Sequence, residues 1–297
     1  MKFPKYWAKG STEFPLQVQN PSTGQEGGSF SCWGWSDVSV EAAEKKGAER
    51  AAAAEKIIRE GGKPRSNEYL YGDRPFREEV LEEWADGDED PYAIVSVNSY
   101  GCRVLNTNSV MFVDVDLPEP ESLPFLVHVV KSLFGSDEPS PREVQEDKAL
   151  AKLRDLAQSD SKFGVRVYRT FAGLRYLLTH VHADPASVTT SKIMELLGAD
   201  PLYVKLCERQ ECFRARLTPK PWRCGMLRAH KSFPWADKTA EERFRDWERE
   251  YSEKAQSFAS CHYVTQMGVD AVDQEIARVV EFHDKETKAL SGMLALA

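Results

Sequence analysis

The stretch Val110–Leu117 (VMFVDVDL) constrains the fold of this chain more than any other. Its apolar residues are typical of a strand buried on both faces, and Asp114 and Asp116 interrupt that pattern. Residues two apart in a strand project to the same side, so the two carboxylates are expected about 6–7 Å apart. Pro118 and Pro120 end the strand at once. The sequence therefore predicts an acidic pair at the carboxyl edge of a sheet, where α/β proteins place their ligand sites.

Two ionised carboxylates in this position would repel each other and lose hydration, so a positive partner is expected between them. One interpretation is a divalent metal, Mg2+ or Mn2+. A second is an ion pair with a neighbouring Arg or Lys, and a third is a chance occurrence of the Asp-x-Asp pattern. The residues alone leave all three open.

Size and charge limit the function classes. A chain of 297 residues can form one large domain or two modules. A net charge of −8 provides no global basic field of the kind that coats duplex DNA, although a local basic groove is compatible with it. The N-terminus lacks a secretory apolar core, no run is long enough to span a membrane, and six scattered cysteines are no disulfide framework. We therefore expect a cytoplasmic protein without a membrane partner.

The pattern predicts three parts: an N-terminal α/β module over residues 1–103, a central module over 104–225 and a helical extension over 226–297. In the first part the expected strands are Phe14–Val18, Ser29–Trp35, Ala93–Asn98 and Arg103–Leu105. The expected helices run from a cap at Ser36–Asp37 or Ser39 to about Glu60, and over Pro75–Trp84. In the last part helices are expected at Lys238–Ser257 and Val272–Leu290, followed by a tail.

The central module carries the acidic strand and a further series of elements. Helices are expected at Leu123–Phe134, Glu143–Gln158 and Ser191–Leu197, and strands at Phe163–Thr170, Tyr176–His180, Tyr203–Cys207 and Phe213–Leu217. A strand, a long helix and then a hairpin form a split β–α–β arrangement of the RNA-recognition-motif type.

Basic residues follow the acidic strand in two groups. In the hairpin, Gly173 permits close backbone approach, and Arg175 with Thr170 could hold a phosphate. Arg214 and Arg216 alternate in a predicted strand and so share a face. For both groups the alternative is that the arginines cover the sheet and pair with acids.

Two more clusters have competing interpretations. Arg223, Arg228, His230 and Lys231 stand beside aromatic residues, as single-strand nucleic-acid contacts do, but a helix-packing loop explains them equally well. Cys207, Cys212 and Cys224 with His230 suggest zinc, although their spacing is loose, and buried thiols are the alternative.

In order, MFVDVDL, VYRTFAGLRYLL and ADPLYVKLCERQECFRARLTPK resemble the three-motif layout of the archaeo-eukaryotic primase superfamily, the primase-polymerases, over residues 100–220. The resemblance implies an α+β fold: an RNA-recognition-motif-like primase-polymerase module with a small N-terminal α/β module and C-terminal helices. It implies catalytic metal ligands at Asp114, Asp116 and Asp200. It also implies nucleotide contacts at Arg175, His180, Arg214, Arg216 and Lys220. Arg175 stands where the family usually has a histidine, with His180 further along the strand.

The resemblance implies a metal-dependent nucleotidyltransferase that joins a nucleoside triphosphate to a nucleic-acid or other hydroxyl, with Mg2+ or Mn2+ as cofactor. Single-stranded nucleic acid and a further protein are additional candidate partners. Two alternatives remain: a non-catalytic module that binds a nucleotide or single-stranded nucleic acid, and a metal-dependent phosphodiesterase or nuclease that uses the same acids. The acidic charge balance favours small ligands or short substrates over long duplexes.

Overall fold

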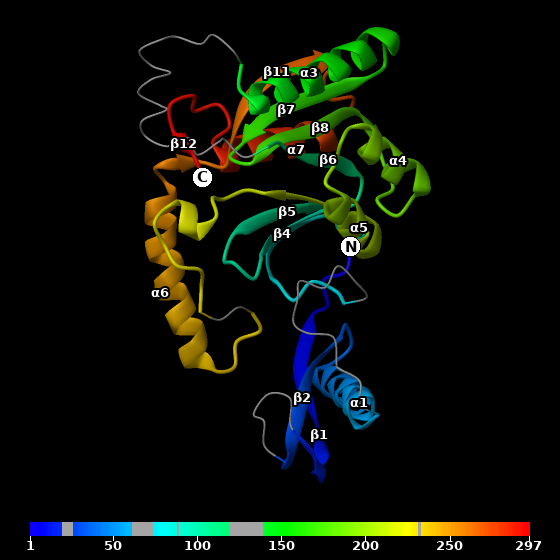
Figure 1. Cartoon of the computed structure of the whole chain (residues 1–297), viewed down its shortest axis with the longest axis vertical. Coiled ribbons are helices and arrows are strands. Elements are labelled where there is room, and N and C mark those ends of the chain that lie inside the picture. The colour runs from blue at the N-terminus through cyan, green and yellow to red at the C-terminus, as the bar shows by residue number, and fades with distance from the viewer. Residues whose placement is uncertain (20–25, 61–73, 88, 119–138, 231–232) are drawn as a thin grey trace. The chain divides into compact units, whose positions relative to one another are not determined.

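The computed structural model describes residues 1–19, 26–60, 74–87, 89–118, 139–230 and 233–297, with only the backbone described for 14–19 and 26–27 (Figure 1). The chain divides into two compact units: a smaller one, Lys2–Arg77, and a larger one formed by Glu78–Ala297 together with Met1. This division does not coincide with the expected boundaries at 103 and 225, because strands expected in the N-terminal module pair within the larger unit.

The smaller unit is a hairpin covered by one helix. Strands β1 (Tyr6–Gln19) and β2 (Glu26–Ser36) are antiparallel, and α1 (Val40–Arg59) begins at Ser39, whose side chain accepts from the Ala42 N–H. A Cβ on Gly10 would lie 2.0 Å from the backbone nitrogen of Ala48, and one on Gly34 would lie 2.0 Å from the Ala43 carbonyl oxygen. The helix therefore lies directly on the strand backbones, which only glycine permits here. The two predicted strands and the helix are confirmed.

One four-stranded sheet of the larger unit has the order β3-β4-β5-β9 and is antiparallel throughout. Its strands are β3 (Glu79–Trp84), β4 (Ala93–Val97), β5 (Arg103–Thr107) and β9 (Phe213–Arg216). The predicted helix at Pro75–Trp84 is wrong, because Glu79–Trp84 forms a strand. The helix preference of its Glu and Leu residues is overridden by pairing with the fully buried β4 and by Trp84, whose ring packs 4.7 Å from that of Phe282.

The second sheet has the order β11-β7-β8-β6, again with antiparallel neighbours. Its strands are β6 (Val110–Asp116), β7 (Gly164–Thr170), β8 (Gly173–His182) and β11 (Cys261–Gly268). Since β6 and β7 both run antiparallel to β8, which lies between them, they are parallel to each other, and α3 (Pro141–Ser159) lies between them in the chain. This is a split β–α–β unit. The predicted helix at Glu143–Gln158 is confirmed, whereas the one at Leu123–Phe134 lies outside the described residues.

The remaining elements are α4 (Val188–Leu196), α5 (Pro201–Gln210), the short 3-10 helix η1 (Pro221–Arg223), α6 (Lys238–Ala255), α7 (Gln274–Thr287) and a small parallel pair, β10 (Phe258–Ala259) with β12 (Ala295–Leu296). The predicted strand at Tyr203–Cys207 is wrong. Asp200 caps this segment and Pro201 occupies the first helical turn, which together favour a helix start. No helix in the described part of the chain combines the length and apolar character needed to cross a membrane.

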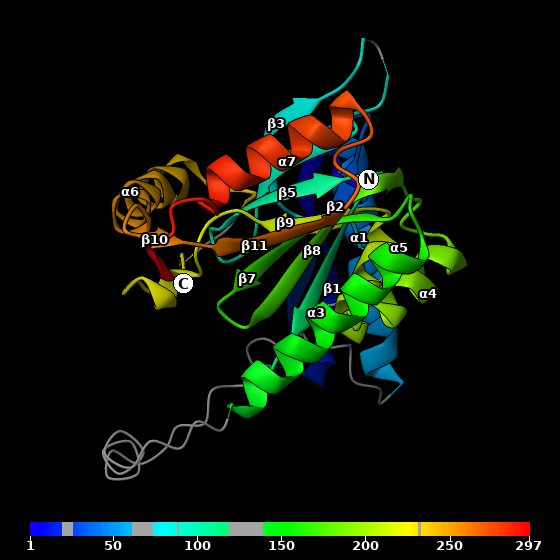
Figure 2. The ribbon, with the colours of Figure 1, turned by 90° about the horizontal axis from the view of Figure 1, so that it is seen from above.

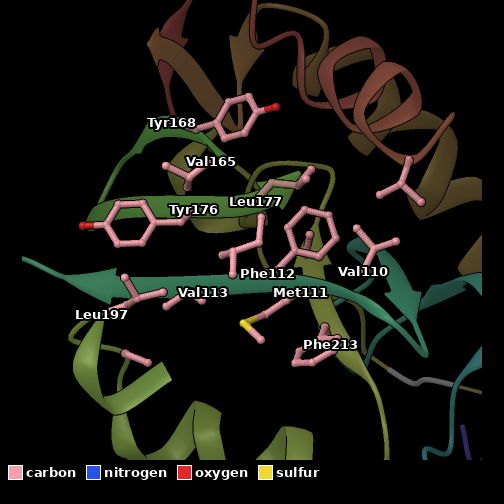
Figure 3. Close-up of a cluster of buried hydrophobic side chains, with 14 of the residues drawn as sticks. Val110, Met111, Phe112, Val113, Val165, Tyr168, Tyr176, Leu177, Leu197 and Phe213 are labelled. Carbon is pink, nitrogen blue, oxygen red and sulfur yellow. The ribbon is translucent and has the colours of Figure 1, made fainter. Parts of the chain in front are cut away.

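Helices pack on both faces of the sheet β11-β7-β8-β6. The Tyr168 ring lies 4.6 Å from that of His283 on α7, whereas the next residue, Arg169, pairs with Glu146 on α3. Neighbouring strand residues point to opposite faces, so α7 and α3 cover opposite sides of β7, with β7 and β8 between them in Figure 2. Figure 3 shows Phe112 on one side of β6 and Met111 on the other. Both are fully buried, which confirms the predicted doubly buried strand.

Candidate functional site

Asp114 on β6 and Arg175 on β8 lie directly opposite each other in the strand register. The guanidinium donates to both carboxylate oxygens, with Nε–Oδ1 at 2.7 Å and Nη2–Oδ2 at 3.0 Å. Arg175 is only 3% exposed, whereas the Asp114 side chain is 36% exposed. Burial would lower the pKa of Arg175, but the Asp114 carboxylate raises it above its ordinary value. Asp114 and Arg175 therefore form a bidentate ion pair in which the carboxylate is partly exposed and the guanidinium is buried.

The inner side of Arg175 contacts two further groups. Its Nη1 donates to the Arg216 carbonyl oxygen at 3.0 Å and lies 3.5 Å from Nε2 of His283 on α7. His283 is fully buried, and burial lowers its pKa to about 4, so the ring is neutral at pH 7. A neutral imidazole can accept a hydrogen bond from Arg175, which a protonated one cannot.

Asp284 extends this network to two residues of β7. Its Oδ1 lies 3.4 Å from Nδ1 of His283 and accepts from the Tyr168 hydroxyl at 2.6 Å, while Oδ2 accepts from Arg166 at 2.5 Å. The chain of polar groups from Asp114 to Arg166 thus crosses the sheet face beneath α7. Each charged group in it has a partner of opposite charge or a hydrogen bond, which fixes the orientation of Arg175.

Asp116 and Asp200 complete the acidic side of the site. The Asp200 N–H donates to the Asp114 carbonyl oxygen at 3.1 Å, and its Oδ1 accepts from the Leu202 N–H at 3.1 Å at the start of α5. This backbone contact brings the start of α5 to the end of β6. Burial raises the pKa of Asp116, and the charges of Asp200 and Asp114 raise it further. The structure therefore brings the three predicted acids together.

The acids do not form a ready metal site. Among the residues that the structure describes, no group of three His, Cys, Asp or Glu side chains is placed to hold a metal ion. Both Asp114 oxygens accept from Arg175, and Asp200 caps a helix. The expected three-carboxylate site for Mg2+ or Mn2+ does not fit this arrangement.

Three cations gather on the other side of the site: Arg216 at the end of β9, Lys220 just before η1 and Arg223 within it. Burial lowers the pKa of each, and charges from neighbouring cations lower it further. Within the described ranges none of the three forms a salt bridge, and the buried Nε of Arg216 has no hydrogen-bond acceptor there. We call these three residues the basic cluster. Positive charge exceeds negative charge here, which favours an anion.

Aromatic rings flank the basic cluster. The Arg223 guanidinium lies 3.9 Å from the centroid of the Phe171 ring at the β7–β8 turn, and Lys220 Nζ lies 5.5 Å from the Trp222 ring. Phe171 and Trp222 are 48% and 49% exposed. Tyr100 holds the Trp222 ring edge-on at 5.4 Å, so both rings are fixed by the protein while part of each remains open to solvent.

Other predicted residues lie elsewhere. Arg214 forms a buried pair with Glu78, with N–O distances of 2.8 and 2.9 Å, so it serves the interior of the sheet β3-β4-β5-β9. Nδ1 of His180 lies 2.9 Å from the Gly164 carbonyl oxygen, and its ring lies 5.0 Å from that of Phe163. His180 is five residues from Arg175, roughly 16 Å along a strand. Thr170 accepts from the Gly173 N–H and closes the hairpin turn.

Sequence reasoning missed two functional neighbours, His283 and Phe171. His283 lies in a helix that the sequence predicts, but its spacing there does not show that it meets an arginine 108 residues earlier. Phe171 stands in the predicted hairpin turn, where an exposed aromatic residue was the available signal. The suggested zinc ligands Cys207, Cys212 and Cys224 are buried thiols and, in the described part of the chain, belong to no metal-binding group.

No model of a protein family, no curated protein and no solved structure matches this chain.

Proposed function

We propose that the larger unit binds a nucleotide, with its phosphate groups on the basic cluster of Arg216, Lys220 and Arg223. The observation that carries this proposal is the charge imbalance: three partly buried cations form no ion pair with any described residue, and the charge of Arg216 lowers the pKa of Lys220 and of Arg223 beyond the effect of burial. A buried cation without a counter-charge is costly, and an anion removes that cost.

Phosphate suits these particular groups. Two guanidinium groups present planar arrays of N–H donors that match phosphate oxygens, and the Lys220 ammonium adds a compact charge. The buried Arg216 Nε–H supplies a donor that needs an acceptor. Several cations close together favour a polyphosphate over a single carboxylate.

The flanking rings support a nucleotide rather than inorganic phosphate alone. Phe171 and Trp222 are each about half exposed and stand beside the cations. Nucleobases stack on aromatic side chains and on arginine planes, with little dependence on base identity. A base next to Trp222 or Phe171 with phosphates on the basic cluster uses both features at once.

Isothermal calorimetry with ATP in the presence of EDTA tests this proposal. Wild type is expected to bind, and Lys220→Gln is expected to bind about tenfold more weakly, because it loses a charge in contact with phosphate. Lys205→Gln, on an exposed position of α5 outside the basic cluster, makes the same charge change and should bind as wild type does. Absence of ATP binding to wild type, or equal loss in both variants, contradicts the proposal.

A second candidate function is nucleotidyl transfer by a primase-polymerase-like module. The split β–α–β unit and the three clustered acids support this candidate. Burial raises the pKa of Asp116, and the charges of Asp200 and Asp114 raise it further, a perturbation that is common among carboxyl groups of reaction centres. Of the three acids, Asp116 and Asp200 form no ion pair with described residues. Asp114 is bound to Arg175 and would have to be released before it could take part in the reaction.

Product analysis tests that second function. Wild type would be incubated with nucleoside triphosphates, Mn2+ and a primed single strand, and pyrophosphate release and strand length would be measured. Transfer that is lost in both Asp116→Asn and Asp200→Asn supports it. Shortened strands without pyrophosphate indicate a nuclease instead, and ATP binding without turnover leaves the non-catalytic binding module.

A further inference from the structure

The smaller unit carries tryptophan and basic residues on the face of its hairpin opposite the two glycines that touch α1. The pairs Trp7–Trp35 and Lys9–Trp33 are directly opposite in the register, so their side chains share one face. The glycines that touch α1, Gly10 and Gly34, occupy the alternate positions and therefore the other face. The apolar packing of the hairpin against the helix thus does not account for these three tryptophans.

Four cations lie over the tryptophan rings of this face. Lys9 Nζ lies 5.2 Å from the Trp33 centroid, and the Arg77 guanidinium lies 5.3 Å from it. Lys46 Nζ and the Arg50 guanidinium reach from α1 to within 4.2 and 4.8 Å of the Trp35 centroid. The Trp/basic face is defined by these seven side chains: Trp7, Lys9, Trp33, Trp35, Lys46, Arg50 and Arg77.

The described residues of the smaller unit do not balance the charge of this face. Within the described part of the smaller unit, none of its four cations forms a salt bridge. Burial lowers the pKa of Arg50 and Arg77, and the charge of Arg74 lowers both further. Residues 2–77 contain twelve Lys and Arg against ten Asp and Glu, although the whole chain has a net charge of −8. The smaller unit is therefore the positive part of an acidic protein.

We propose that the Trp/basic face binds single-stranded nucleic acid. Phosphates would meet the four cations, and unpaired bases would stack on the indole rings beside them, since each indole is only partly buried. A single strand fits better than a duplex, because its bases are open to stacking. This site is separate from the basic cluster of the larger unit and does not depend on the function proposed for it.

Fluorescence anisotropy of the full-length chain with labelled oligo(dT) and oligo(rU) tests the proposal. Wild type is expected to bind, and the double variant Lys46→Gln/Arg77→Gln is expected to bind about tenfold or more weakly. Its affinity should also depend less on salt, by about 1.4 in the logarithmic slope for two lost phosphate contacts. Trp33→Leu should weaken binding without changing that slope.

The matched control is Lys45→Gln/Lys56→Gln, which removes the same charge from exposed positions of α1. The helical period places both on the side of α1 away from the positions that meet the hairpin, Ala43 and Gly47. This control should keep wild-type affinity. A circular-dichroism melt of each variant checks that the unit remains folded.

Four results would overturn the proposal. Wild type could fail to bind either oligonucleotide, or the test and control variants could lose affinity equally. Alternatively, Lys220→Gln/Arg223→Gln could abolish oligonucleotide binding while Lys46→Gln/Arg77→Gln preserves it, which places the strand on the larger unit. Competition by polyglutamate as strong as that by unlabelled oligo(dT) would also count against it, because the face would then select charge alone.

Discussion

Two sets of charges in the larger unit lie close together but differ in whether they have ion-pair partners among the described residues. The acidic set on β6 is anchored by Arg175, which holds Asp114 through two hydrogen bonds and has the neutral His283 behind it. The basic cluster has no such anchor among the described residues. The comparison teaches that a charged pair inside the protein supports the fold, whereas cations that form no ion pair with a described residue are available for a ligand.

The largest expected effect on stability comes from breaking the ion pair between Asp114 and Arg175. Asp114→Ala leaves the Arg175 guanidinium buried without its carboxylate, which should lower the free energy of unfolding by about 3–5 kcal/mol in urea denaturation. Asp116→Ala, two residues along the same strand, is the control and should cost less than about 1 kcal/mol. If Asp114→Ala costs no more than its control, the ion pair does not stabilise the fold and the metal interpretation gains support.

The buried imidazole behind the pair should make stability depend on pH. The pKa of His283 is about 4 in the folded protein against 6.5 ordinarily, so the unfolded chain binds more protons between these values. The free energy of unfolding should therefore fall by up to about 3 kcal/mol from this group as the pH drops from 6.5 to 4. Urea denaturation across that range should show a shallower decline for His283→Gln. Parallel curves for the two proteins would contradict the prediction.

Removing a residue of the basic cluster should weaken ligand binding without lowering the stability of the fold. Arg223→Gln is expected to weaken ATP binding by about 10- to 100-fold, the range for hydrogen bonds to charged groups. Its free energy of unfolding should stay equal to that of wild type or rise, because one cation leaves a repelling set. A variant that loses stability along with affinity would show that the cluster is structural.

The smallest effect is expected at the ring beside the cluster. Trp222→Leu should weaken ATP binding by about fivefold, the lower end for a base stacked on an aromatic side chain. Its affinity for inorganic tripolyphosphate, which has no base, should equal that of wild type. Calorimetry with both ligands separates the two contributions, and an equal loss for both would remove Trp222 from the base-binding role.

The elements that the sequence predicts correctly are those with a local signal. The strand β6 follows from its apolar run and the two prolines after it, α3 from its helical period, and the hairpin β7–β8 from the alternation around Gly173. The position of Asp114 and Asp116 two residues apart at the end of this strand follows from the same local pattern. These features depend on residues near one another in the chain, which propensity and period describe.

The features that the sequence did not show depend on distant residues. Glu79–Trp84 forms a strand because it pairs with β4. The strand β11 was not predicted, because its mixed sequence adopts a strand conformation only through pairing with β7. Arg214 and Arg216 look equivalent in the sequence, yet the first meets Glu78 and the second has no salt bridge with described residues. Local periodicity determined which residues share a face. Long-range packing decided which charges found partners, because a partner's identity is set by the position of elements far apart in the chain.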